Sequence, residues 1–101
     1  MRNQDYSILI RELKAGKESA FDSLFRLFYQ DLCRFACSFL NDPMMAEDVV
    51  QGIFEKIWTR KKFIDESQQL DHYLYVSVRN ACYTFLKNKK EHVKLDEVDS
   101  R

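Results

Sequence analysis

The chain has 101 residues, of which 46% are hydrophobic and 32% charged, with only two glycines and one proline. This size supports one domain with a modest core, and the scarcity of Gly and Pro favours a soluble helical protein. No apolar run approaches the ~20 residues that a membrane-spanning helix needs, and residues 1–6 lack the apolar core of a secretory signal. We therefore expect a cytoplasmic protein without membrane insertion.

The formal net charge is zero, but the charges are segregated along the chain. Residues 60–90 hold seven basic and three acidic residues, whereas residues 1–59 and 91–101 each carry two more acids than bases. A neutral chain as a whole argues against a nucleic-acid binder, but a local basic block of this kind fits one.

In chain order, the first predicted element is a short helix over residues 6–13. Gly16 is expected to end it in a left-handed conformation, and Ser19 to cap the helix that follows. Helical apolar spacing then runs through residues 21–40. The pattern leaves open whether this stretch is one helix or two that break near Tyr29.

The tripeptide Asn41-Asp42-Pro43 predicts a stop and a restart, with Asp42 as N-cap and Pro43 in the first helical position. The helix that follows runs through Trp58, and the polar residues 59–69, which lack a sustained period, predict a loop. A last helix is expected from about Leu70 to about Lys89, with residues 91–101 as a frayed or disordered tail. No alternating strand pattern occurs, so we predict an all-α fold, a small bundle of four to five helices.

The helix over residues 46–58 has two different faces. Apolar residues recur at helical spacing and must be buried: Val49, Val50, Ile53, Phe54, Ile57 and Trp58. Trp58, at the end of this stripe, is interpreted as a core residue. The other side carries Glu47, Asp48, Gln51 and Glu55, a surface suited to a protein partner. The helix dipole alone favours acids near the start of a helix, but it does not explain Gln51, which lies deeper.

The last helix has the opposite character. No acidic residue occurs between Arg79 and Lys90, and basic and aromatic side chains alternate on its exposed face. Such a helix suits a nucleic-acid backbone with unstacked bases. Packing within the bundle remains an alternative for the tyrosines and for Arg79. Lys87-Asn88-Lys89-Lys90 is also favoured by the helix dipole at a C-terminus.

The sequence offers no case for catalysis, a cofactor or a metal. Cys33 and Cys37 are four residues apart, but His72 and His92 lack a ligand partner at a convincing spacing. The three cysteines are interpreted as small core hydrophobes. No His stands near a nucleophile in a recognisable arrangement, and there is no phosphate-binding loop. We expect a protein that is not an enzyme.

Taken in order, several segments resemble region 2 of bacterial sigma factors, in particular the extracytoplasmic-function group. The resemblance covers Ala20 to Lys90. Its marks are Ala20-Phe21 with Leu24 and Tyr29, Leu32 to Ala36, Ala46 to Gln51 leading to Phe54 and Trp58, then Tyr73-Leu74 and Arg79-Asn80-Ala81.

The resemblance implies a sigma region 2 domain that binds core RNA polymerase and recognises and melts the promoter minus-ten element. The helix that carries Glu47, Asp48, Gln51 and Glu55 is expected to bind the coiled coil of the β′ subunit. The loop and last helix are expected to contact promoter DNA, including the non-template strand of the minus-ten element. The implied DNA-binding residues, together with the basic end of the helix, are Arg60, Lys61, Lys62, Tyr75, Arg79, Asn80, Tyr83, Lys87, Lys89 and Lys90.

Some positions depart from the family pattern. Gly52 and Thr84 stand where acidic residues are common, and Lys87 stands where Arg is common. Residues 1–90 are expected to form the region 2-like domain, and residues 91–101 the start of an interdomain linker. No part of the sequence after Lys90 is expected to form the family's second, helix-turn-helix domain, so the chain resembles the N-terminal domain of a longer protein. A natural one-domain protein is the alternative.

An anti-sigma factor is an expected partner, and the domain is expected to be a monomer. The main alternative is a sigma-like helical module that binds a regulator without touching DNA. A weaker alternative is a basic bundle that binds RNA without sequence preference.

Overall fold

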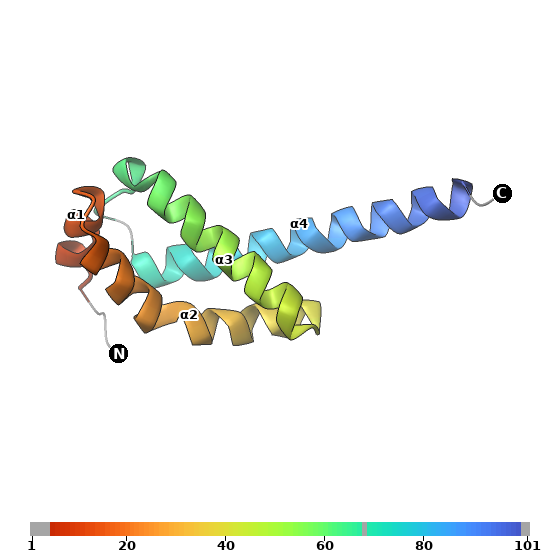
Figure 1. Cartoon of the computed structure of the whole chain (residues 1–101), viewed down its shortest axis with the longest axis horizontal. Coiled ribbons are helices and arrows are strands. Elements are labelled where there is room, and N and C mark those ends of the chain that lie inside the picture. Colours follow the sequence, from red (N-terminus) through yellow and green to blue (C-terminus); the bar gives the residue numbers. More distant parts are fainter. Residues whose placement is uncertain (1–4, 68, 100–101) are drawn as a thin grey trace.

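A computed structural model describes residues 5–67 and 69–99, with side chains to residue 90. Its elements are α1 (Ser7–Lys14), α2 (Glu18–Leu40), α3 (Pro43–Thr59), the 3₁₀ turn η1 (Lys61–Phe63) and α4 (Leu70–Asp99). Figure 1 shows α1 at one end of the bundle and α4 projecting from the other. The described residues contain no strand, and the predicted all-α bundle is confirmed.

The turn between α1 and α2 follows one prediction and contradicts another. Gly16 has a φ of +86°, the left-handed conformation expected of a helix-terminating glycine. The prediction that Ser19 caps α2 is wrong, because Lys17 is the N-cap and Ser19 lies inside the helix. The extended backbone of Lys17 directs its carbonyl oxygen to the amides of Ala20 and Phe21, at 3.1 and 3.3 Å. Glu18 then stands in the first turn, where the helix dipole favours an acid.

Helix α2 is continuous through Tyr29, which settles the alternative that the sequence left open. Neither Gly nor Pro interrupts its 23 residues. The ring of Tyr29 stacks on that of Phe25 one turn earlier, with centroids 4.3 Å apart. Such pairs, four residues apart, stabilise a helix across the point where a break was possible.

The connection from α2 to α3 matches the prediction closely. Asn41 takes a left-handed conformation, with φ +57°, and ends α2. The Asp42 carboxylate then accepts hydrogen bonds from the amides of Met44 and Met45, at 3.0 and 3.2 Å. Pro43 occupies the first helical position, where its missing N–H has no cost.

The last helix is longer than predicted. We expected it to end near Lys89 before a frayed tail over residues 91–101, but α4 continues to Asp99. Residues 91–99 contain no Gly or Pro, so the chain meets no helix terminator there. The polarity that predicted a tail is compatible with a solvated helix. Whether this part belongs to a linker stays a prediction.

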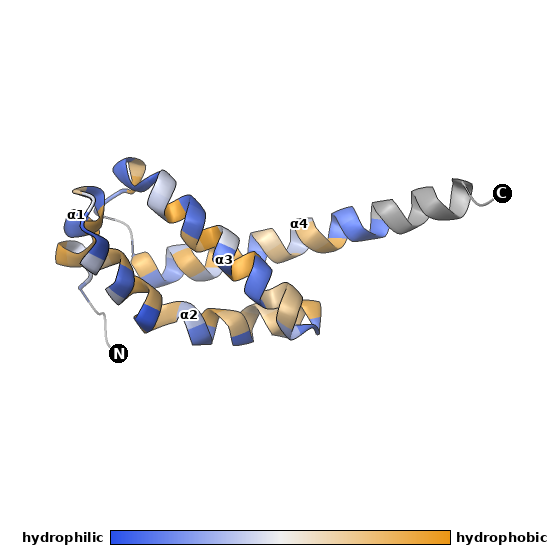
Figure 2. Ribbon diagram, in the orientation of Figure 1, coloured by the Kyte–Doolittle hydropathy of each residue, from blue (hydrophilic) through white to orange (hydrophobic). Residues whose placement is uncertain are grey.

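The core forms where α2 packs against α1, α3 and α4. In Figure 2, hydrophilic residues lie along the outer edge of α2 and hydrophobic ones on the side toward α3 and α4. The largest fully buried side chains are Ile10, Leu13, Leu24, Leu32, Val50, Leu70, Leu74, Val78 and Cys82. Cys33 and Cys37 are half-buried against this core, so the cysteines pack as the sequence predicted.

Candidate functional site

The predicted docking surface on α3 is present as an exposed row of acids. Glu47, Asp48 and Glu55 are exposed, and none of them forms an ion pair with another described residue. We call these three residues the acidic ridge. Unpaired carboxylates on a rigid helix keep their charge available to cationic side chains of a partner.

Gln51 lies on the same side of α3 but has a partner within the fold. Its Nε2 donates a hydrogen bond to the Tyr29 hydroxyl on α2, at 3.3 Å. This bond lowers the pKa of Tyr29, but burial and the neighbouring Cys33 and Glu47 outweigh it and leave the pKa raised. The helix dipole does not explain Gln51, but this contact with α2 offers an explanation besides docking, which the sequence did not reveal. Gln51 nevertheless remains exposed.

At its C-terminal end the acidic ridge borders a hollow between α2 and α3. This hollow, of about 520 Å³, is lined by Glu18, Phe21, Asp22, Glu55, Trp58 and Thr59. The rings of Phe21 and Trp58 form its aromatic part, with centroids 5.2 Å apart. Half-buried Trp58 packs on α2, which agrees with its interpretation as a core residue.

On the opposite flank of α3, a groove separates it from α4. The groove has a volume of about 430 Å³ and is lined by Ile53, Lys56, Ile57, Tyr73, Ser77, Asn80, Ala81 and Thr84. A second hollow of about 270 Å³ shares three of these residues and adds Arg60, Phe63 and Ile64. Together they place two cations, two aromatic rings and several hydrogen-bonding groups along one continuous depression.

The predicted DNA-binding residues of α4 do not all lie on one side. Asn80 lines the groove, next to Arg79, whose Nη2 donates to the Asn80 Oδ1 at 3.4 Å. Tyr75 and Tyr83 instead face α2, where their rings pack edge-on against Phe35 and Phe39, with centroids 4.9 and 5.4 Å apart. Burial raises the pKa of Tyr75, and the nearby Asp31 and Asp71 add to the effect. Lys87, Lys89 and Lys90 are exposed farther along the helix.

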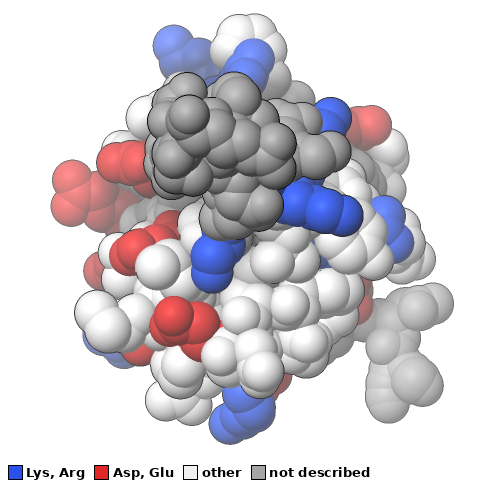
Figure 3. All heavy atoms as spheres, turned by 90° about the vertical axis from the view of Figure 1, so that its right-hand side faces the viewer, with Lys and Arg blue, Asp and Glu red and all other residues white. Residues whose placement is uncertain are grey.

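The basic triplet at the start of the loop is also divided. Arg60 and Lys62 are exposed, whereas Lys61 is half-buried with its ammonium 3.9 Å from the centroid of the Trp58 ring. Viewed from the end of α4, Figure 3 shows several acidic side chains gathered on the left and basic ones around the grey helix.

Sequence reasoning missed several residues of the groove. Lys56, Tyr73 and Ser77 line it, but none of them was among the predicted DNA-binding residues. Phe63 is 83% exposed. A large apolar residue inside a polar, basic loop was the available signal for it, because such a side chain has no core to enter.

These features define an all-α binding domain in which one helix separates an acidic surface from a groove with basic and aromatic residues. A model of the Sigma-70 region 2 family matches residues 24–92. The chain belongs to this family, whose members are non-catalytic domains of transcription initiation factors. Membership assigns it a role in RNA polymerase binding and promoter recognition. No curated protein and no solved structure matches the chain significantly.

Two features are absent from the residues that the structure describes. None of the helices there is long and apolar enough to cross a membrane. Within the same residues, no group of three or more His, Cys, Asp or Glu side chains is arranged to hold a metal ion.

Proposed function

We propose that this domain docks on the β′ coiled coil of core RNA polymerase through α3 and captures minus-ten promoter bases along the α3–α4 groove. The observation that carries the proposal is the position of α3, which exposes the acidic ridge on one flank and borders the groove on the other. A domain held by the ridge keeps the groove free for DNA. The extracytoplasmic-function group, a cytoplasmic location and control by an anti-sigma factor belong to the same proposal.

The acidic ridge supports the docking half of the proposal. Asp48 and Glu55 have no partner among the described residues, so a cationic side chain of the polymerase can pair with them without breaking a bond within the domain. Gln51 is a weaker candidate, because docking through its amide competes with the hydrogen bond to Tyr29. Glu47 lies beside the Gln51–Tyr29 hydrogen bond and extends the acidic ridge toward the start of α3.

The groove supports the promoter half. Lys56 and Arg60 can attract the phosphate backbone, while Tyr73 and Phe63 offer aromatic faces on which an extruded base can stack. Asn80 and Ser77 add hydrogen-bonding groups to the same wall. Stacking contributes about 1–3 kcal/mol per base, which offsets the few kcal/mol needed to unstack it from the duplex.

A binding measurement with matched charge reversals tests the docking half. We expect wild-type protein to bind an isolated β′ coiled coil, and Asp48→Arg with Glu55→Arg to weaken binding by at least about tenfold, since each lost charge-assisted contact is worth about 1.5–3 kcal/mol. Asp31→Arg is a single charge reversal on the side of α2 near Tyr75, where it also removes the ion pair with Arg34, and it should bind normally. Circular dichroism checks that each variant is folded. Absence of wild-type binding would exclude the proposed docking.

The alternative is a sigma-like module that binds a regulator without touching DNA. It is favoured by Tyr75, whose half-buried ring packs on Phe35 of α2, whereas Tyr83 contacts Phe39 but stays 53% exposed. Promoter opening by holoenzyme with Arg79→Ala and Lys87→Ala separates the two functions. We expect opening to be lost although polymerase binding persists. Unchanged opening in this variant would favour the alternative.

A further inference from the structure

The loop that follows α3 begins with Arg60-Lys61-Lys62, and one of these cations is held by the fold itself. The Lys61 ammonium lies 3.9 Å from the centroid of the Trp58 ring and donates a hydrogen bond to the Trp58 carbonyl oxygen at 3.0 Å. It is half-buried, unlike its two neighbours. An ammonium engaged by an aromatic face and a carbonyl has given up part of its hydration and one of its three donors, and is less available to a phosphate.

The stem of Lys61 also lies against the turn between α1 and α2. Its Cε is 3.7 Å from the position that a Cβ would take at Gly16. In addition, α1 is in contact with η1, the turn to which Lys61 belongs. The side chain therefore lies between the end of α3 and the turn that joins α1 to α2, at the beginning of the loop.

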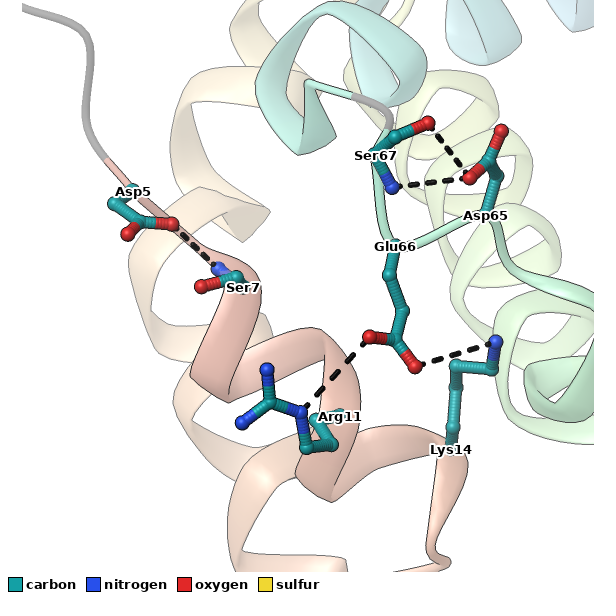
Figure 4. A network of polar contacts seen from close by, with 7 residues as sticks. All are labelled: Asp5, Ser7, Arg11, Lys14, Asp65, Glu66 and Ser67. Carbon is teal, nitrogen blue, oxygen red and sulfur yellow. Dashed lines mark hydrogen bonds and ion pairs between the residues drawn. The ribbon is translucent and has the colours of Figure 1, made fainter.

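The other end of the loop is attached to α1. Figure 4 shows Glu66 pointing toward two cations of that helix, with Oε1 3.9 Å from the Arg11 Nε and Oε2 3.7 Å from the Lys14 Nζ. The neighbouring Asp65 carboxylate accepts hydrogen bonds from the amide and the hydroxyl of Ser67, at 3.0 and 2.8 Å. One exposed ion pair contributes little, but here two cations converge on the same carboxylate beside a turn that is closed by its own hydrogen bonds.

We propose that Lys61 and Glu66 are positioning residues that hold the loop against α3 and α1, and that Lys61 does not itself contact DNA. Between these anchors the loop presents Lys62 and Phe63, both of which are exposed. The chemistry of the presented pair, a cation beside an aromatic ring, fits a nucleotide. This last step rests on the proposed function, whereas the anchoring of the loop does not.

Two adjacent lysines provide a matched test of the anchor. Lys61→Met keeps most of the stem and removes the charge, and Lys62→Met makes the same change at an exposed neighbour. Trp58 is the only tryptophan, so its fluorescence reports the contact directly. We expect Lys61→Met to shift the emission and to speed amide hydrogen exchange over residues 60–67 by roughly twofold to thirtyfold, the range of a cation–π contact. Lys62→Met should change neither. Identical behaviour of the two variants would overturn the proposal.

A charge swap tests the second anchor and remains informative if Lys61→Met disturbs the fold. Glu66→Lys should speed exchange over residues 64–67, because it replaces an attraction to Arg11 and Lys14 with repulsion. Adding Lys14→Glu should slow that exchange again, while exchange in the middle of α2 stays unchanged in both proteins. Failure of the second substitution to restore protection would show that Glu66 does not act through α1.

The DNA step is tested with polymerase holoenzyme and a promoter fragment over a range of salt concentrations. Removing a lysine that contacts phosphate lowers the slope of log affinity against log salt by about one. We expect this for Lys62→Met, whereas Lys61→Met should weaken binding without changing the slope. An equal fall in slope for both variants would make Lys61 a phosphate ligand. If wild-type protein forms no promoter complex, the proposed function fails, and fluorescence and exchange still decide on the anchors.

Discussion

The two glycines of this chain should respond in opposite ways to the same substitution. Gly52 lies in the interior of α3, and a Cβ added there would meet no atom within 4 Å. Alanine therefore fits without strain and removes the entropic cost of glycine in a helix, about 0.5–1 kcal/mol. In a domain of this size, 1 kcal/mol corresponds to about 4–8 °C in Tm. We expect Gly52→Ala to raise Tm by about 2–8 °C.

Gly16→Ala is the control. A Cβ also has room at Gly16, but the backbone there has a conformation that alanine rarely adopts. The nearest atom to its added Cβ is the Lys61 Cε at 3.7 Å, an ordinary contact, but φ is +86°. Alanine in the left-handed region costs roughly 1–2 kcal/mol, so this variant should be less stable by about that amount.

Urea unfolding followed by far-ultraviolet circular dichroism measures both variants, and thermal melts give the Tm values. The reasoning is refuted if Gly52→Ala is destabilising, or if Gly16→Ala is as stable as the wild type. The Gly52→Ala variant can also be compared with the wild type in polymerase binding. Unchanged binding by the stabilised protein would show that the partner does not need the bare backbone at Gly52.

Three further predictions concern local contacts. Asp42→Ala removes the cap of α3 and should lower the free energy of unfolding by about 0.5–2 kcal/mol in urea titrations. Burial raises the pKa of Tyr75 above its ordinary 10.0. The stability contributed by the neutral Tyr75 ring therefore persists at neutral pH and is lost as pH rises through the raised pKa. Phenolate absorbance of the wild type compared with Tyr75→Phe measures this titration. Hydrogen bonds from Ser67 lower the pKa of Asp65 below 3.8, so its turn should stay closed above that pH and open in stronger acid, measured by exchange of the Ser67 amide.

Each of these has a clear opposite. A neutral Asp42→Ala variant would mean that water replaces the cap. If Tyr75→Phe removes no phenolate component that titrates above pH 10, the result would argue against burial of the Tyr75 ring. Acceleration of Ser67 exchange already near neutral pH would show that the Asp65 carboxylate does not close the turn.

The helices were predictable where the local chemistry was strong. Asn41-Asp42-Pro43 combines a left-handed residue, a capping carboxylate and a proline, and all three act as their types suggest. Ser19 was misassigned because capping depends on the backbone that precedes the helix, and Gly16 shifts that start to Lys17. The end of α4 was placed too early, near Lys89, because the polar stretch that follows has no apolar period, although it also has no helix terminator.

The candidate site was only partly predictable, because helical periodicity tells which residues are exposed but not which neighbouring helix they face. It identified the acidic ridge, yet it could not show that Gln51 reaches Tyr29 on α2. The resemblance to the sigma family grouped Tyr75 with Asn80 as DNA-binding residues, although one faces α2 and the other the groove beside α3. Lys61 appeared equivalent to Lys62 until the position of Trp58 was known.

The short connections of the fold have a consequence for how it assembles. Only Asn41 and Asp42 separate α2 from α3, so closing that hairpin costs little chain entropy, whereas α4 must return across residues 60–69. We expect the α2–α3 hairpin to form early and α4 to dock last, with overall folding in microseconds to milliseconds as in other helical domains of low contact order. Once docked, α4 is held by four fully buried side chains, Leu70, Leu74, Val78 and Cys82, whereas the short helix α1 buries only Ile10 and Leu13. We therefore expect α1 to detach before α4 in partial unfolding, so that the wall of the groove that carries Asn80 outlasts the first opening of the bundle.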